Sequence, residues 1–167
     1  DRRDATGTLW LSYPRPKSPK TTGLELNLKL GETFVDGGKF VSHDGDSSET
    51  STRPAAWVYS SAARGIQRCT VPLRGVGDKP ANYSVRLYFS SGSAKTPKPG
   101  NRVFDVHLQG LVVLKSVDAA KSGQDGTVVV EVRNVAVEDQ LTIELVAKTG
   151  EQPMLSGIEV SESPAGR

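Results

Sequence analysis

The sequence predicts an all-β fold, an antiparallel β-sandwich, from three observations. Several short runs alternate apolar and polar residues, which places every second side chain on the same face of a strand. Turns rich in Gly, Pro and Asp separate these runs at short intervals, as they do in β-sandwiches. Apolar residues form 36% of the 167-residue chain and occur in short Val-, Leu- and Ile-rich runs, a composition that strands favour.

The N-terminal part of the chain predicts one strand followed by a long loop. In Leu24–Leu30 four leucines occupy alternate positions and the residues between them are polar, so one face of this strand is expected to be buried. Residues Asp36–Pro54 consist mainly of Gly, Ser, Thr and Asp, with Phe40 and Val41 as apolar anchors. We expect this segment to be an exposed loop, an element that often carries binding residues.

The remaining strands are predicted from alternation in the second part of the chain. In Tyr83–Phe89 the first, third, fifth and seventh residues are expected to face the core, which leaves Tyr88 on the opposite face. A short helical turn is predicted within Val117–Ser122. Further alternating runs predict strands at Ile66–Leu73, Val103–Gln109, Thr127–Arg133 and Leu141–Leu145, with Ile158 and Val160 near the C-terminus.

Charge and length exclude several classes of protein. The net charge is only +2, from 21 basic and 19 acidic residues that are scattered along the chain, whereas nucleic acids and anionic membranes require concentrated positive charge. No apolar run approaches the ~20 residues that span a bilayer, so we expect neither nucleic-acid binding nor membrane insertion. Because the chain opens at Asp1 without a Met or a secretion signal, residues 1–167 are interpreted as one domain excised from a larger multidomain protein.

The sequence contains no recognisable catalytic pattern, and we expect no enzymatic activity. Cys69 is the single cysteine, so it is interpreted as a small buried residue rather than as part of a disulfide or a metal-thiolate cluster. His107 lies on the non-core face of its predicted strand, and no motif marks a partner for it. A glycoside hydrolase or lyase would need two carboxylates across a cleft, an arrangement that sequence alone does not reveal.

A calcium site is one alternative for the segment His43–Glu49. Asp44, Asp46 and Glu49 offer the hard oxygen ligands that calcium prefers, but the segment lacks the twelve-residue spacing of an EF-hand loop. An ordinary solvated loop is the other interpretation, and we favour it. No other cofactor is expected.

Aromatic residues are the most informative candidates for ligand contacts, since sugar rings stack on aromatic faces through their C–H groups. Trp57 and Tyr59 occupy alternate positions of Ala55–Ser60 and are expected to share a face directly after the polar loop. Core packing and ligand contact both remain open for these two residues. Trp10 is expected on the face opposite its apolar neighbours, where packing is favoured.

Several segments, taken together and in order, resemble the malectin family of carbohydrate-binding domains. The combination of Arg-Val-Phe-Asp-Val with Gly-Ile-Glu-Val is more specific than either motif alone, and the likeness covers residues 56–160. The opening, Gly7–Pro14, resembles bacterial members that are attached to larger secreted proteins. The segments that carry the resemblance are Tyr83–Phe89, Asn101–Gly110, Val113–Asp118, Leu141–Leu145 and Pro153–Val160.

The resemblance implies a jelly-roll-like sandwich related to galactose-binding modules, with a carbohydrate site in the loops at one end and no catalysis. Tyr59 is at a position similar to a ligand-binding tyrosine of the family, and Glu151 lies near the family's ligand-binding aspartate. The loop after Phe89 departs from the family. It reads Ser90–Thr96 where malectin carries two adjacent sugar-stacking aromatics, so malectin's disaccharide specificity is not carried over. Asp105 is interpreted as a structural hydrogen-bonding residue.

The leading hypothesis is a lectin-like, extracytoplasmic or secreted bacterial domain that binds carbohydrate through Trp57, Tyr59 and Glu151. Aromatic stacking and hydrogen bonds would supply the affinity, and the loops Asp36–Pro54 and Ser90–Gly100 would form the walls of the site. The alternative is a protein-interaction or architectural domain of a larger extracytoplasmic protein without a sugar site. An exposed apolar patch on a sheet face would mark that alternative. Neighbouring domains of the parent chain are further expected partners.

Overall fold

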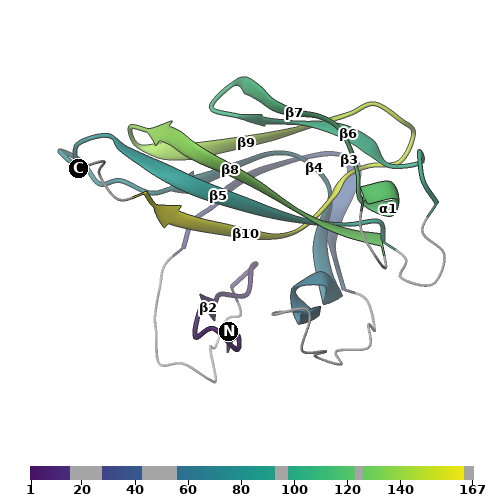
Figure 1. Ribbon diagram of the computed structural model, residues 1–167, viewed down its shortest axis with the longest axis horizontal. Helices are drawn as coiled ribbons and strands as arrows, with labels where there is room; N and C mark the ends of the chain where they lie inside the picture. Colours follow the sequence, from purple (N-terminus) through teal and green to yellow (C-terminus); the bar gives the residue numbers. More distant parts are fainter. Residues whose placement is uncertain (16–27, 43–55, 93–97, 123–125, 164–167) are drawn as a thin grey trace.

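The predicted fold class is confirmed, because the described part of the chain is an antiparallel β-sandwich that curves until it is almost closed (Figure 1). The structure is a computed structural model that describes residues 1–15, 28–42, 56–92, 98–122 and 126–163. The strands of the sandwich follow the order β7-β6-β9-β4-β10-β5-β8, and β3 also pairs with β4. Their bounds are β3 Gly31–Ser42, β4 Ser61–Pro72, β5 Ala81–Ser90, β6 Val103–Leu108, β7 Leu111–Asp118, β8 Thr127–Val137, β9 Gln140–Ala147 and β10 Met154–Glu162.

Smaller elements complete the described chain. A short ribbon of β1 (Arg2–Arg3) and β2 (Leu9–Trp10) lies near the N-terminus, the 3-10 helix η1 covers Ala56–Ser60, and α1 covers Ala119–Ser122. The position of α1 confirms the helical turn predicted within Val117–Ser122. In the described ranges, no helix has the length and apolar character needed to cross a membrane.

Strand β4 connects the two layers of the sandwich, because its two halves pair with different strands. Ala63 and Arg64 pair with the first residues of β10, whereas Arg68–Pro72 pair with β9. Gly65 lies between these two regions with a φ of 73°, a conformation that glycine adopts without the strain of a Cβ atom. The change of partner therefore occurs where the backbone takes a conformation that other residues rarely adopt.

The core consists of the inward sets that the alternation predicts. The side chains of Val85, Leu87 and Phe89 on β5 are completely buried, and the ring of Phe89 packs against that of Phe104 with centroids 4.8 Å apart. Cys69 is buried in the same core, and burial raises the pKa of its thiol to about 11. Cys69 is therefore a packed, protonated core residue at neutral pH, as expected.

The structure corrects the predictions for the N-terminal half. Residues 28–30 of the predicted strand Leu24–Leu30 are not in a strand, and residues 24–27 lie outside the described ranges. The first seven residues of the predicted loop Asp36–Pro54 instead complete β3, and the rest of that loop is not described. The register of β3 against β4 shifts between Phe34 and Lys39. The period of two is interrupted there, so alternation of apolar and polar residues does not predict this strand.

Candidate functional site

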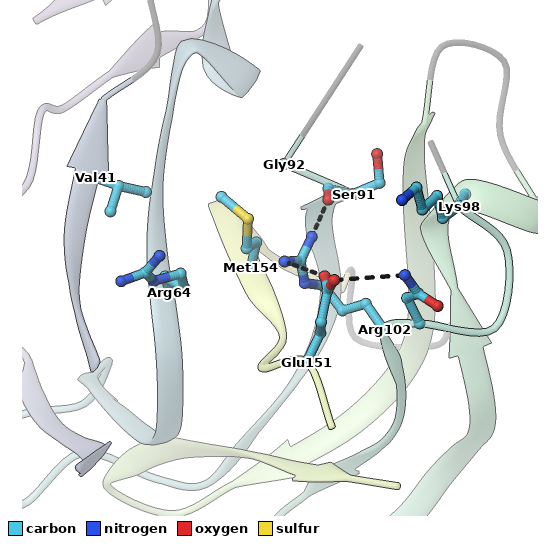
Figure 2. A pocket seen from close by; sticks show the side chains of 10 residues that line it. Val41, Arg64, Ser91, Gly92, Lys98, Arg102, Glu151 and Met154 are labelled. Atoms are coloured by element: carbon cyan, nitrogen blue, oxygen red, sulfur yellow. Dashed lines mark hydrogen bonds and ion pairs between the residues drawn. The ribbon is translucent and has the colours of Figure 1, made fainter. Parts of the chain in front are cut away.

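The described loops at one end of the sandwich surround a pocket of about 330 Å³, which we call the end pocket (Figure 2). It lies where β3, β5 and β7 end and where β4, β6 and β10 begin, on the side of α1 in Figure 1. Residues of the predicted wall Ser90–Gly100 contribute to it. The residues that line it include Arg64, Gly92, Lys98, Arg102, Glu151 and Met154.

Arg102 organises the end pocket by joining three segments of the chain. Its Nε donates to the carbonyl of Gln152 at 2.5 Å, and its Nη1 donates to the carbonyl of Ser91. Its Nη2 forms an ion pair with Oε2 of Glu151 at 2.8 Å. Burial lowers the pKa of Arg102, and the carboxylate of Glu151 opposes that shift. The guanidinium thus fixes the position of Glu151, whose other oxygen accepts a 3.5 Å hydrogen bond from Asn101.

Gly92 lines the end pocket and allows Met154 and Arg102 to approach closely. Its φ is 81°, and a Cβ at this position would lie 2.6 Å from Sδ of Met154 and 3.0 Å from Nη1 of Arg102. Contacts this close are not tolerated without movement of the neighbours. A side chain at residue 92 would therefore force Met154 to move and would press against the guanidinium that holds Glu151.

The N-terminal end of α1 fixes the segment that leads into β6. Asp118 is buried, and its Oδ1 accepts hydrogen bonds from the backbone N–H groups of Ala120 and Lys121 at 3.0 and 3.3 Å. Such capping is typical of aspartate before a helix. Its Oδ2 accepts a 2.7 Å hydrogen bond from the N–H of Gly100. This contact holds the segment from Lys98 to Arg102 against α1.

Four aromatic residues form a separate cluster on the outer face of β5 and β10. Trp10 meets Trp57 edge-on at 5.9 Å and Tyr88 edge-on at 5.1 Å, and Tyr59 lies 6.1 Å from Tyr88, all measured between ring centroids. A Cβ at Gly157 of β10 would lie 3.1 Å from the ring of Trp10. The cluster therefore packs the N-terminal ribbon against the sheet, which confirms the expected packing role of Trp10.

The expectation that Trp57 and Tyr59 share a strand face is wrong, because residues 56–60 form η1. The hydroxyl of Ser60 donates to the carbonyl of Trp57 at 2.7 Å, a local bond that favours a turn over an extended strand. Residues two apart on a 3-10 helix point in different directions, and the two rings accordingly meet different partners. Neither Trp57 nor Tyr59 is among the described residues that line the end pocket.

The other predicted site residues have distinct outcomes. Glu151 lies in the end pocket. Asp105 is buried, accepts a 2.8 Å hydrogen bond from the N–H of Ser116 and pairs with Lys148 at 3.0 Å, which confirms its structural role. Asp44 and Asp46 fall outside the described ranges, within which no group of three His, Cys, Asp or Glu residues is placed to hold a metal.

A second hollow, of about 420 Å³, lies on the outer face of β5, β8 and β10. Its two described glutamates, Glu131 and Glu159, both pair with Arg86, at 3.1 and 3.5 Å. Glu131 also pairs with Arg133, and these basic partners lower the pKa of Glu131. Glu131 is thus not held protonated as the general acid of a glycosidase would be.

Arg64, Lys98 and Arg102 were missed by sequence reasoning. Arg102 is the first residue of the Arg-Val-Phe-Asp-Val motif, but nothing in that motif indicates that its side chain turns toward residues some 50 positions later. Arg64 and Lys98 carry no motif at all. Their common location follows only from the way β4 and the segment before β6 meet at the same end of the sandwich.

An antiparallel β-sandwich with a pocket among its end loops places the chain in the class of ligand-binding β-sandwich domains. The family model for the malectin domain matches residues 58–164, and the chain therefore belongs to the malectin family. The match begins after the opening segment, so the resemblance of Gly7–Pro14 to bacterial members stays a prediction. A comparison with curated proteins finds no significant match.

Solved structures with a similar fold include parts of much larger proteins. A β-glucuronidase from Bacteroides uniformis is 16% identical with a TM-score of 0.57, over 79% of this chain and 14% of the enzyme. A complex of the plant peptide RALF23 with FER and LLG2 contains a similar chain, 20% identical with a TM-score of 0.59 over 78% of this chain and 40% of that one. The ANX2 ectodomain from Arabidopsis thaliana is 13% identical, with a TM-score of 0.57 over 78% of this chain and 41% of that ectodomain. At these identities the similarity shows the fold alone.

Proposed function

We propose that this chain is a non-catalytic carbohydrate-binding domain of an extracytoplasmic protein, and that the carbohydrate occupies the end pocket. The observation that carries the proposal is the placement of Glu151. This residue lines the pocket and is oriented by Arg102, and the family resemblance places it near a ligand-binding aspartate. Carboxylate, amide and guanidinium groups in one pocket suit the hydroxyl groups of a sugar. Membership of the malectin family and the ectodomain of a plant receptor-like kinase with a similar fold support it.

In this proposal the polar groups of the end pocket bind the sugar, and stacking on Trp57 or Tyr59 is not required. The aromatic cluster occupies the outer sheet face, where Trp10 covers part of Trp57 and Tyr88. Stacking of a sugar on Trp57 or Tyr59 stays a prediction, and it is tested by the variants Trp57→Ala and Tyr59→Ala. Loss of binding in either folded variant, with binding retained in Glu151→Gln, would move the site from the end pocket to the cluster.

A glycan array with the purified domain tests the proposal. We expect at least one glycan to bind, and Glu151→Gln to weaken it by about tenfold or more, since a hydrogen bond to a charged group contributes roughly 1.5–3 kcal/mol. Glu138→Gln removes the same charge from the β8–β9 turn at the opposite end of the sandwich and serves as the matched control. Equal binding by wild type and Glu151→Gln would refute the assignment of the end pocket.

Protein binding is the second candidate function, and one observation favours it. Leu111 and Val112 begin β7, the edge strand that pairs only with β6 in the described sheet, and they are 71% and 47% exposed. Exposed apolar residues on an unpaired edge favour association with another chain. Absence of any glycan ligand, together with association that Leu111→Ser abolishes, would favour this function over carbohydrate binding.

A further inference from the structure

The end pocket carries more positive than negative charge. Three basic residues line it, Arg64, Lys98 and Arg102, whereas Glu151 is the single carboxylate among the described residues of its wall. Arg102 is already committed to Glu151 and to two backbone carbonyls. Within the described ranges, Arg64 and Lys98 have no ion-pair partner. Two cations of the pocket therefore remain available to a ligand.

This lack of partners distinguishes Arg64 from other arginines on the strands of the sandwich. Arg86 pairs with two glutamates on the outer sheet face, and Arg68, four residues from Arg64 on β4, lies 3.9 Å from Glu144. The charges of these two arginines are thus balanced by neighbouring glutamates. Among the described residues that line the end pocket the charges do not balance, and the excess is positive.

The unpaired cations lie on two sides of the pocket. Figure 2 shows Arg64 on β4 at one side and Lys98 at the other, with the Arg102–Glu151 pair between them. The charge of Arg64 is near enough to lower the pKa of Arg102. A ligand in the pocket therefore meets positive charge from both sides, while the carboxylate of Glu151 accepts hydrogen bonds from hydroxyl groups.

We propose that the end pocket selects a sugar residue that carries an anionic group, a carboxylate or a sulfate, which Arg64 and Lys98 bind. This inference rests on the proposed function and names the class of sugar. A guanidinium binds such a group through two parallel hydrogen bonds, and an ammonium binds it as a point charge. A volume of about 330 Å³ is at the lower end for small-molecule sites, which suits one or two sugar residues rather than a long chain segment.

Isothermal titration with matched ligands tests the inference. The probes are galacturonic and glucuronic acid oligomers, each with its methyl ester, which removes the negative charge and leaves the sugar otherwise similar. A third arm uses a sulfated disaccharide and its unsulfated form. At low salt we expect each charged form that binds to do so about five- to tenfold more tightly than its neutral counterpart. About two- to threefold from each of two exposed ion pairs gives this preference. The preference should decrease as salt increases.

Variants test whether Arg64 and Lys98 cause the preference for charged sugars. Arg64→Gln and Lys98→Gln should each reduce the preference for the charged form by about half or more, whereas Arg68→Gln, on the same strand but outside the pocket, should leave it unchanged. Thermal unfolding verifies that each variant is folded. The uronate and sulfate arms show which anionic group is preferred. Equal affinity for charged and neutral forms, with neutral glycans still bound, refutes the selection of acidic sugars and leaves the proposed function standing. Absence of binding to every sugar refutes both.

Discussion

The substitution Arg102→Lys should destabilise the domain although it keeps the charge. The guanidinium of Arg102 reaches three acceptors in three segments, the carbonyls of Ser91 and Gln152 and the carboxylate of Glu151. A lysine ammonium lacks the planar fork that spans them, so we expect about two of the three interactions to be lost. At roughly 1 kcal/mol net for each hydrogen bond, the free energy of unfolding should fall by about 2 kcal/mol. That loss corresponds to a decrease in Tm of about 4–8 °C for a domain of this size.

Urea unfolding followed by circular dichroism measures this loss. Arg68→Lys is the matched control, because Arg68 is more than half exposed and lies 3.9 Å from Glu144, so its replacement should change stability by less than about 0.5 kcal/mol. Glycan binding should weaken in Arg102→Lys as Glu151 loses its fixed position. If the free energy of unfolding of Arg102→Lys is within about 0.5 kcal/mol of the wild-type value, the guanidinium does not join the three segments as described.

Two further predictions concern the N-terminal ribbon. Trp10→Ala removes two edge-to-face ring contacts, each worth about 0.5–1.5 kcal/mol, so the free energy of unfolding should fall by about 2 kcal/mol. Amide hydrogen exchange in residues 1–15 should become faster, and unchanged exchange would contradict the packing role. Hydrogen bonds from Thr6 and from the indole N–H of Trp10 lower the pKa of Asp4 to about 2. Because the folded-state pKa is lowered, Asp4 stabilises the ribbon at pH values above its unfolded pKa of about 3.9. This contribution is lost as the pH falls toward about 2. Tryptophan fluorescence between these pH values should change more steeply in wild type than in Asp4→Asn, and identical profiles would refute the contribution of Asp4.

The sequence by itself determined the strands that follow a regular period of two. The inward residues of β5 and β9 are buried as predicted, with Val85, Leu87 and Leu141 completely inaccessible. This success has a simple physical reason, because a strand with one face on the core must alternate, and a slip of one residue would expose the whole apolar set. The resemblance added the family, which the match to the malectin model confirms.

The predictions for β3 and η1 were wrong because the period of two is interrupted locally in both segments. In β3 the register shifts around two adjacent glycines, Gly37 and Gly38, so a strand with bulges looks like a polar loop. In η1 a serine hydroxyl bonds the backbone three residues earlier, and an apparently alternating run becomes a turn. In both segments a local backbone conformation overrides the side-chain pattern on which the prediction depends.

Only the tertiary structure decided the composition of the end pocket. Arg64 and Glu151 lie 87 positions apart in the sequence, and neither belongs to a motif that indicates the other. They meet because antiparallel strands return the chain repeatedly to the same end of the sandwich, where β4 begins and β10 is about to begin. Glu151 could be chosen from the family resemblance. Its partner Arg102, the close approach of Gly92 to Arg102 and the unpaired cations follow only from the packing of loops that carry no periodic signal of their own.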